Sequence, residues 1–320
     1  MSFTILGTGM AVPKYSMTND EMSKIVDTSD EWIRTRTGIQ QRRICTTETI
    51  TDLTVEASLK ALDEAKVDPK ELDLIICATL RGEYITPSQA CVIQSKIGAV
   101  CPAFDVNAAC SGFVYALDVA DSFFSSGKVK KVLVVGFENL SNITNWEDRS
   151  TCVLFGDGGG AVVLGEGDDL LSIHTTAKGN PDVLYAPHGE NCSPFYKHES
   201  EKPHIHMNGN EVYKFAVTSM VRGIRKAVKD AGLTMEDVTY VVPHQANLRI
   251  IDAAAERLGA VPRENYLCNI QNYGNTSAGC MPIVLDEANK AGKFKKGDII
   301  AMCAFGGGLT TGSCVIRWGK

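Results

Sequence analysis

Three residues of types that can serve as nucleophile, base or hydrogen-bond donor stand beside expected strands and helices: Cys110, His244 and Asn275. Cys110 lies between an extended segment, 103–106, and a run whose apolar residues recur at roughly helical spacing. We expect it in the first turn of that helix, where unpaired N–H groups and the helix dipole favour a nucleophilic thiolate. The alternative is a small buried residue, the commonest role of a free cysteine.

His244 and Asn275 come from the second half of the chain. His244 directly follows an apolar strand expected over 238–242, and Asn275 precedes a helix expected over 276–290. Function in open α/β sheets collects at the carboxyl ends of strands, so the three side chains could converge. Taken alone, the histidine is as readily structural as catalytic, and the asparagine is most simply a helix N-cap. The combination with Cys110 favours a Cys-His-Asn site.

The elements that must position these residues occur twice. Strand and helix patterns alternate along the chain, which is typical of an α/β protein. The corresponding segments are 3–12 and 171–177, 52–65 and 212–231, 72–80 and 238–242, the helix after Cys110 and 276–290, 131–137 and 299–305, and 161–164 and 312–318. We therefore predict two similar halves, 1–167 and 168–320, each too open to bury its sheet alone, joined near 165–169.

Composition excludes several classes of protein. Hydrophobic residues make up 44% of the 320 residues, enough for a sizeable core, and a net charge of −6 argues against general nucleic-acid or membrane-surface binding. The 11 cysteines form no C-x-x-C pair, which indicates free thiols in a reducing cytoplasm and not a disulfide framework or a zinc site. We find neither a signal-peptide pattern nor an apolar run of membrane-spanning length, and expect a cytoplasmic protein.

Glycine-rich segments and a histidine-rich insertion suggest other ligands only weakly. Gly7-Thr-Gly9 leads into Val12-Pro13 and not into a helix, so the dinucleotide-binding fingerprint is absent. The tracts 155–160 and 305–308 are expected to form tight turns, and Gly307 could also aim an N–H group at an oxyanion. The insertion 180–207 contains four histidines and Cys192, but their spacing matches no common metal site, so we expect a polar surface loop.

Six segments together resemble those of the β-ketoacyl-acyl carrier protein synthase III family. They are Asp-Glu-Trp-Ile-Arg-Thr-Arg-Thr-Gly-Ile (30–39), Asn-Ala-Ala-Cys-Ser-Gly (107–112), Phe-Gly-Asp-Gly (155–158), Met-Asn-Gly-Asn-Glu-Val (207–212), Pro-His-Gln-Ala-Asn (243–247) and Gly-Asn-Thr-Ser-Ala (274–278). The resemblance runs in order to Trp318. It implies a thiolase fold with α-β-α-β-α layers, a homodimer, and the first condensation of type II fatty acid synthesis, with no metal or redox cofactor. In that reaction acyl-CoA and malonyl-acyl carrier protein give 3-oxoacyl-acyl carrier protein, CO₂ and CoA.

The resemblance also implies a role for individual residues. Cys110 would carry the acyl group, the N–H groups of Cys110 and Gly307 would hold the oxyanion, and His244 and Asn275 would donate to the enolate oxygen. CoA would be bound by Trp32, Arg36, Arg149, Gly209, Tyr213 and Asn247, with Trp32 and Arg149 sandwiching the adenine and Arg36 meeting phosphate. Lys214, Gln245 and Arg249 would bind the carrier protein. Ordinary packing of Trp32 and a solvated face for the arginines are the simpler alternatives.

One position departs from the family in a way that predicts specificity. Thr86 stands where the family commonly has a phenylalanine that closes the acyl pocket, so we expect room for primers of about four to eight carbons, each buried CH₂ contributing about 0.8 kcal/mol.

Three other functions stay open. A thiolase needs a second cysteine in the C-terminal glycine tract, which 304–308 lacks, and a papain-like hydrolase has a cysteine signature not found here. A non-condensing acyltransferase or acyl-binding protein differs in releasing no CO₂ from a malonyl thioester.

Overall fold

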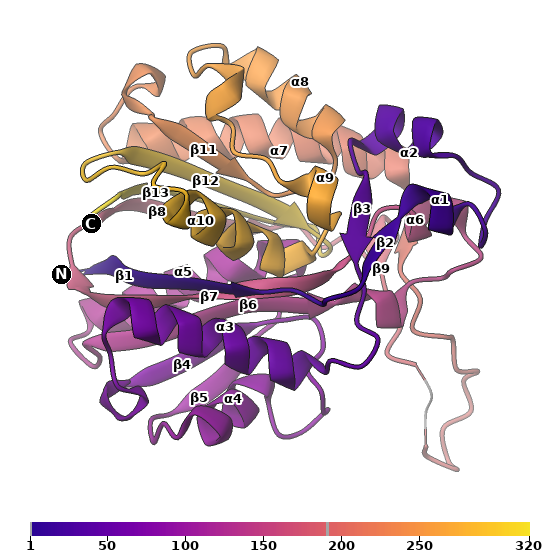
Figure 1. Ribbon diagram of the computed structural model, residues 1–320, viewed down its shortest axis with the longest axis horizontal. Coiled ribbons are helices and arrows are strands. Elements are labelled where there is room, and N and C mark those ends of the chain that lie inside the picture. The colour runs from indigo at the N-terminus through magenta and orange to yellow at the C-terminus, as the bar shows by residue number, and fades with distance from the viewer. Residues whose placement is uncertain (1, 190–191) are drawn as a thin grey trace.

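The computed structural model, which describes residues 2–189 and 192–320, is built around two β-sheets (Figure 1). Each half of the chain forms one of these sheets. The first sheet has the order β1-β7-β6-β4-β5 and the second the order β11-β12-β13-β8. The strands are β1 (Ser2–Ala11), β4 (Leu74–Ala78), β5 (Ala103–Val106), β6 (Lys131–Asn139), β7 (Asp157–Gly167), β8 (Leu170–Ala177), β11 (Tyr240–Pro243), β12 (Ile299–Gly306) and β13 (Thr310–Arg317).

The strand directions confirm the repeated order read from the sequence. In the first sheet β1 is antiparallel to β7, β7 is antiparallel to β6, and β6 is parallel to β4. In the second sheet the same relations hold between β8 and β13, β13 and β12, and β12 and β11. Strand β5 extends only the first sheet, by parallel pairing with β4.

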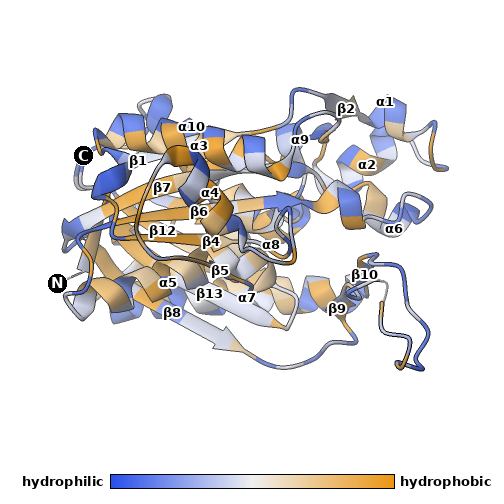
Figure 2. Ribbon diagram, turned by 90° about the horizontal axis from the view of Figure 1, so that it is seen from below, coloured by the Kyte–Doolittle hydropathy of each residue, from blue (hydrophilic) through white to orange (hydrophobic). Residues whose placement is uncertain are grey.

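Helices complete five layers, α-β-α-β-α. Between the sheets lie α5 (Gly112–Ser125) and α10 (Cys280–Lys290), whose buried side chains form one core with the inner faces of both sheets. The outer face of the first sheet is covered by α3 (Ile50–Ala65) and α4 (Gln89–Ile97), and that of the second by α7 (Gly209–Asp230) and α8 (Leu248–Leu258). Figure 2 shows the apolar residues concentrated in the strands between these helices.

Shorter elements gather at one end of the sheets. They are β2 (Ser16–Thr18), α1 (Asn19–Met22), α2 (Asp30–Thr37), β3 (Gln41–Arg43), α6 (Arg149–Cys152), β9 (Leu184–Tyr185), β10 (His206–Met207) and α9 (Ile270–Tyr273). Helix α2 begins at Asp30, because the Ser29 hydroxyl caps it by accepting from the N–H of Trp32. It ends before Gly38, which has a left-handed conformation.

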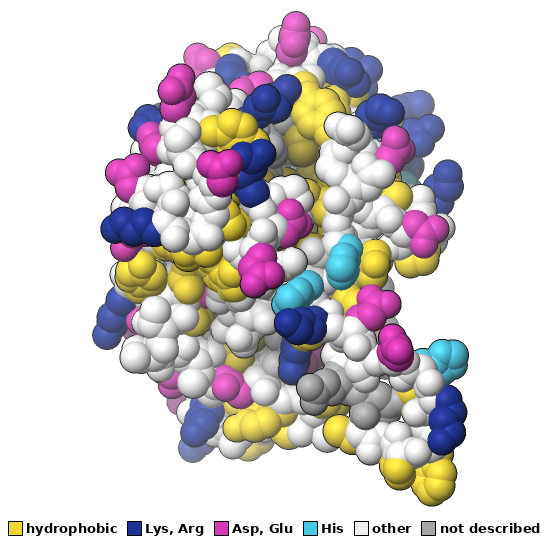
Figure 3. All heavy atoms as spheres, turned by 90° about the vertical axis from the view of Figure 1, so that its right-hand side faces the viewer, with side chains coloured by type: hydrophobic (Ala, Val, Ile, Leu, Met, Phe, Trp, Pro, Cys, Tyr) yellow, Lys and Arg dark blue, Asp and Glu magenta, His cyan; other side chains and the backbone are white. Residues whose placement is uncertain are grey.

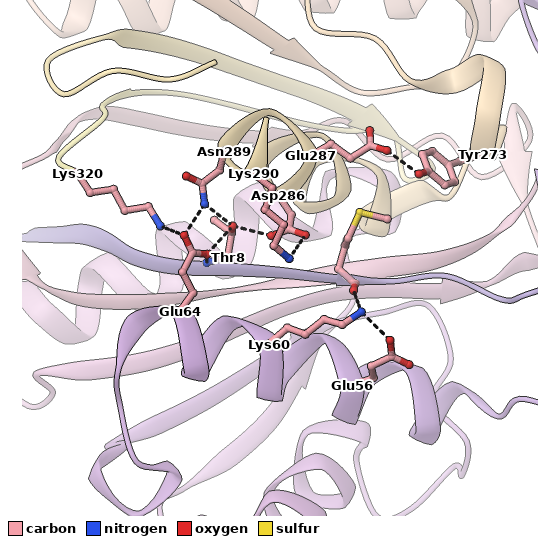
Figure 4. A network of polar contacts seen from close by, with 11 residues as sticks. Thr8, Glu56, Lys60, Glu64, Tyr273, Asp286, Glu287, Asn289, Lys290 and Lys320 are labelled. Carbon is pink, nitrogen blue, oxygen red and sulfur yellow. Dashed lines mark hydrogen bonds and ion pairs between the residues drawn. The ribbon is translucent and has the colours of Figure 1, made fainter. Parts of the chain in front are cut away.

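A polar network ties the layers together (Figure 4). The Thr8 hydroxyl on β1 donates to Asp286 of α10 at 2.7 Å, and Asn289 of α10 donates to Glu64 of α3 at 2.7 Å. Lys320, at the C-terminus, also contacts the Glu64 carboxylate. Since Asp286 and Thr8 are buried, these bonds satisfy polar groups inside the packed layers.

The prediction of a tight turn over 155–160 was wrong for Asp157–Gly160, which belong to β7 and pair with β6, and of which Gly159 and Gly160 also pair with β1. Glycine is needed there for close packing. A Cβ atom on Gly159 would lie 2.1 Å from the carbonyl oxygen of Gly136 on β6.

The insertion 180–207 extends as a long loop away from the two sheets (Figure 1), and its described residues are mostly exposed. None of the described helices is both long and apolar enough to cross a membrane.

Candidate active site

Cys110 lies on a strained turn at the start of α5. The short 3-10 helix Ala109–Ser111 precedes α5, and Ala109 has a positive φ of 47°, which a residue with a Cβ rarely adopts. The Thr310 hydroxyl on β13 holds this turn by donating to the carbonyl oxygen of Ala108 at 3.0 Å. Strain of this kind is retained where the surrounding structure fixes a functional side chain.

The second half has a matching turn without a nucleophile. Ser277 has a φ of 49° and opens the 3-10 helix Ser277–Gly279 before α10. The residue after the strained one is Cys110 in the first half and Ala278 in the second. The two turns contact each other between the sheets, so residues of both halves meet there.

A chamber of about 350 Å³ brings the predicted residues together. Cys110, His244 and Asn275 all line it, together with Gly307, as predicted from the two halves. Its walls are mainly apolar, which suits the alkyl chain of a thioester. The apolar lining residues include Leu80, Leu140, Ile143, Phe155, Leu184 and Ile205. Figure 3 faces the end of the molecule where the short elements gather, with hydrophobic side chains visible in its hollows and Lys and Arg side chains around them.

The burial of Cys110 opposes the thiolate form that was expected for it. It keeps part of its surface open to the chamber, but the surrounding protein raises its pKa to about 12, chiefly by burial. A hydrogen bond with Ser277 opposes this shift, and the nearby Glu138 adds to it. None of the groups that shift its pKa is a cation, which would favour the thiolate.

His244 is a neutral imidazole. It is buried behind the chamber wall, with the ring of Phe305 meeting it edge-on at a centroid distance of 5.0 Å. Burial lowers its pKa to about 3. Its backbone N–H donates to the carbonyl oxygen of Cys303 at 2.8 Å, and its Nδ1 lies 3.0 Å from Sγ of Cys280. A neutral ring has one donor and one acceptor nitrogen, so the partner of Nδ1 decides what Nε2 can do.

Asn275 is held so that its amide nitrogen is available. Its Oδ1 accepts the N–H of Ser277 at 2.9 Å, and its backbone bonds to Leu154 and Gly156 on either side. It does not cap α10, whose N-cap residue is Gly279. Because Oδ1 is occupied, the Nδ2 hydrogens are the end of the side chain that a ligand can receive.

The end of β12 lies against the Cys110 turn. A Cβ atom on Gly306 would be 2.6 Å from the backbone nitrogen of Cys110, so only glycine allows this approach. Gly307 follows it on the chamber wall. The backbone N–H groups of Cys110 and Gly307 thus belong to adjoining segments, as an oxyanion hole requires.

Cationic and aromatic side chains surround the mouth of the chamber. The guanidinium groups of Arg36 and Arg149 lie 5.7 and 5.0 Å from the centre of the half-buried Trp32 ring. Arg149 also donates to the carbonyl oxygen of Asp27 at 2.8 Å. Both arginines are exposed, as binding to a soluble anion requires.

The remaining residues predicted to bind CoA line the same chamber: Gly209, Tyr213 and Asn247. Asn247 caps α8 by accepting the N–H of Arg249 at 2.9 Å, and its Nδ2 donates to the carbonyl oxygen of Arg36 at 3.1 Å. It therefore connects α8 to α2 at the mouth.

Of the three residues predicted to bind the carrier protein, two are exposed and one is buried. Lys214 is exposed on α7 and pairs with Glu211 at 3.3 Å, and Arg249 is exposed on α8 with its guanidinium 5.9 Å from the Tyr213 ring. The prediction for Gln245 was wrong, because its side chain is fully buried. Its Nε2 donates to the carbonyl oxygens of Pro243 and Leu267, and its Oε1 accepts the N–H of Asn269. Gln245 braces the loop after β11.

Thr86 does not line the chamber within one chain. It is exposed in the loop before α4, next to Tyr84 and Ile85, which are 56% and 81% exposed. In the single chain the wall of the chamber is formed by other residues.

Two buried polar residues near the site escaped sequence reasoning. Glu138 is the last residue but one of β6, and its carboxylate accepts from the N–H of Leu80 at 3.1 Å and from the Ser277 hydroxyl at 3.3 Å. Burial raises its pKa to about 8. The only signal was a glutamate closing the apolar run 132–137. No signal in the sequence indicated a role for Cys280, because its partner His244 is 36 residues away along the chain.

The part of the chain that the structure describes contains no group of three potential metal-binding side chains. Of the residues in the insertion, 190 and 191 lie outside the described part, and the histidines of its described part form no such group. The chemistry available in the chamber is therefore that of a thiol, a neutral imidazole and amide donors.

Comparisons with known proteins agree with this arrangement. Family models described as 3-oxoacyl-(acyl-carrier-protein) synthase III and its C-terminal part match residues 104–179 and 228–318. A curated protein of Clostridium acetobutylicum, β-ketoacyl-(acyl-carrier-protein) synthase III, is 49% identical over 100% of this chain and 99% of its own length. The protein of that name from Aquifex aeolicus is 51% identical over 99% of this chain and 100% of its own.

Solved structures show the same fold. The 3-oxoacyl-(acyl-carrier-protein) synthase III of Aquifex aeolicus superposes with a TM-score of 0.91, covering 98% of this chain and 99% of that chain. That of Thermus thermophilus, 42% identical, superposes with a TM-score of 0.92 over 99% of both chains. The similarity therefore extends over both halves and includes the segments that carry Cys110, His244 and Asn275.

Proposed function

Because this chain belongs to the β-ketoacyl-(acyl-carrier-protein) synthase III family, we propose that its chamber performs the family's condensation with Cys110 as nucleophile and His244 and Asn275 as donors. The observation that carries the assignment is that these residues, from both halves, line one chamber beside Gly307. The protein is a condensing enzyme that starts type II fatty acid synthesis.

In the first half-reaction Cys110 takes the acyl group from acyl-CoA. Its sulfur attacks the thioester carbonyl, and the N–H groups of Cys110 and Gly307 stabilise the oxyanion. The C–S bond to CoA breaks, and the proton lost by the Cys110 thiol ends on the CoA sulfur. Trp32, Arg36 and Arg149 are positioned at the mouth to bind the nucleotide end of CoA, with Gly209, Tyr213 and Asn247 along the pantetheine arm.

In the second half-reaction malonyl-acyl carrier protein loses CO₂. The electron pair of the broken C–C bond becomes an enolate, whose oxygen receives hydrogen bonds from His244 and Asn275. The enolate carbon attacks the acyl group on Cys110, and the released sulfur takes up a proton. Two neutral donors fit this charge because a carboxylate at the same place would repel it. The reaction as written needs no metal or redox cofactor.

The homodimer is part of the proposal. The exposed apolar loop with Tyr84, Ile85 and Thr86 supports it, because such side chains are usually covered by a partner. Thr86 would then close the acyl chamber of the neighbouring copy. The free cysteines support a cytoplasmic location.

Acylation and condensation are separable in a direct test of this function. Intact-mass measurement after incubation with a panel of acyl-CoAs should show one acyl adduct, which Cys110→Ser abolishes. Asn275→Ala should still form the adduct but lose CO₂ release from malonyl-acyl carrier protein by about 10²–10³-fold, as for one lost oxyanion donor.

Two results would contradict the assignment. An acyl adduct that persists on another cysteine in Cys110→Ser would show that Cys110 is not the nucleophile. An equal loss of acylation and condensation in Asn275→Ala would make Asn275 a structural residue. A wild-type protein that is acylated but releases no CO₂ would instead be a non-condensing acyltransferase.

A further inference from the structure

Cys280 contacts Nδ1 of the His244 ring and does not itself line the chamber. It is the first residue of α10, is 2% exposed, and its Sγ lies 3.0 Å from Nδ1 of His244. The same sulfur accepts the backbone N–H of Gln245 at 3.4 Å. The proposed mechanism does not use the Cys280 thiol. This thiol is nevertheless hydrogen-bonded to His244, which the mechanism does use.

Counting donors and acceptors shows which atom carries each proton. Burial raises the pKa of Cys280, so its sulfur keeps its hydrogen, and His244 is neutral. Within the described residues, the polar partners of Sγ are Nδ1 and the backbone N–H groups of Gln245, Met281 and Cys280 itself, and these N–H groups can only donate. The S–H hydrogen is paired only if it points at Nδ1. If Nδ1 donated instead, the buried S–H would have no acceptor, which is unfavourable.

We propose that Cys280 is a positioning residue that holds His244 in the tautomer with its proton on Nε2. This inference rests on the proposed function and deepens it. With Nδ1 accepting from Cys280, Nε2–H is a donor on the chamber side of the ring. An enolate oxygen requires a donor there, whereas the opposite tautomer would present a lone pair and repel the developing charge.

Among the groups that contact the His244 ring, the Cys280 thiol is the one that determines its tautomer. Phe305 packs against the ring edge-on and offers it no lone pair. Cys110 is close enough that a negative charge on it raises the pKa of Cys280, which keeps Cys280 protonated during turnover. Burial is the larger cause of the raised pKa of Cys280, so the donor to Nδ1 is also present while Cys110 carries the acyl group.

The proposal makes Cys280 important for one half-reaction only. Decarboxylation needs the Nε2–H donor, but attack of Cys110 on acyl-CoA uses backbone N–H groups. We therefore expect Cys280→Ala to reduce CO₂ release and condensation by about 10-fold or more, with acylation of Cys110 changed by less than about threefold, the full loss of a donor costing about 10²–10³-fold. Cys280→Ser keeps both a donor and an acceptor at this place and should restore condensation to near the wild-type rate.

Cys314→Ala provides a matched control. Cys314 is another fully buried thiol of the same core cluster, and it lies on β13 away from His244. Its loss should leave the ratio of condensation to acylation unchanged. A general effect of removing a buried thiol would appear in both alanine variants.

Nitrogen-15 NMR of histidine-labelled protein reads the tautomer directly. The His244 signals are those missing from a His244→Ala spectrum. We expect a proton on Nε2 in the wild type and in Cys280→Ser, and a mixture of tautomers in Cys280→Ala. Because the wild type alone answers the main question, the test holds even if Cys280→Ala does not fold.

Two outcomes would overturn the inference: a wild-type His244 with its proton on Nδ1, or equal losses of acylation and condensation in Cys280→Ala with an unchanged tautomer. Failure of the proposed function looks different. A wild-type protein that forms the acyl adduct but never releases CO₂ would refute the condensation, whatever the NMR spectrum shows.

Discussion

At the scale of single residues, the protonation state of Cys110 governs how the first half-reaction depends on pH. Burial raises the pKa of this thiol to about 12, so nearly all of it is protonated at pH 7. Below its pKa the thiolate fraction rises about tenfold for each pH unit, because each unit lowers the proton concentration tenfold. Deprotonation of Cys110 is thus the step that more alkaline solution favours.

We predict that the rate of Cys110 acylation by acyl-CoA rises steeply, approaching tenfold per unit, from pH 7 to pH 8.5. The measurement is single-turnover adduct formation followed by mass spectrometry. It is best made on a Cys192→Ser background, which removes an exposed thiol from the reaction. A rate that has already levelled off at pH 7 would show that the thiol ionises more easily than its buried setting indicates.

What could be read from the sequence at this scale followed from residue type. A cysteine bracketed by small residues, a histidine after a strand and an asparagine before a helix were sufficient to predict the nucleophile and donors. Partners that meet only in three dimensions were not predictable: Cys280 against His244, and Glu138 against Ser277. Gln245 was misplaced for the same reason, since its sequence neighbours do not reveal that its amide is used inside the protein.

At the scale of elements, α7 and α8 supply the cations proposed for docking of the carrier protein. Arg249 stands near the start of α8 and lies over Tyr213 of α7, which lines the chamber. Lys214 is already paired with Glu211, so part of its charge is neutralised. Arg249 is therefore the better site to test for recognition of an acidic partner.

We predict that Arg249→Glu raises the apparent KM for malonyl-acyl carrier protein by roughly tenfold or more and changes the KM for acyl-CoA much less, because long-range attraction to an acidic protein is reversed. Added salt should narrow the difference, as the screening length is about 8 Å at physiological ionic strength. Lys226→Glu, on the same helix as Tyr213 but paired with Asp230, is the control. Equal effects on both substrates would place Arg249 in the CoA site.

Elements were the most predictable part of the fold. The order of strands and helices in each half followed from apolar patterns, because each half must bury one face of its sheet. The extent of β7 did not. Asp157–Gly160 looked like a turn because glycines usually mark turns, yet here they allow the backbone of β6 to approach closely.

At the scale of the whole molecule, the specificity for the primer depends on what covers the loop before α4. Thr86 is exposed in one chain, so its proposed role in the acyl chamber requires a second copy. No feature of a single sequence could show this, because the pattern of one chain does not say which copy a residue serves.

We predict that acyl-CoAs of about four to eight carbons acylate the wild type at least as fast as acetyl-CoA, from the contribution of about 0.8 kcal/mol for each buried CH₂. Thr86→Phe should slow the longer primers by about tenfold or more and spare acetyl-CoA, because the ring fills the space that the longer chains occupy. Competition between primers for Cys110, read by intact mass, measures this. A wild type that accepts only acetyl-CoA would refute the pocket, and a monomer in solution would remove the route by which Thr86 reaches it.

The matching turns at Ala109 and Ser277 have a consequence for how such a chain evolves. In two identical subunits, any change at one turn is inherited by the other, so a cysteine on one always brings a second. Joining the two copies in one gene breaks that coupling. In this chain the residue after the strained one is Cys110 in the first half and Ala278 in the second, so a change at either turn leaves the other turn unaltered.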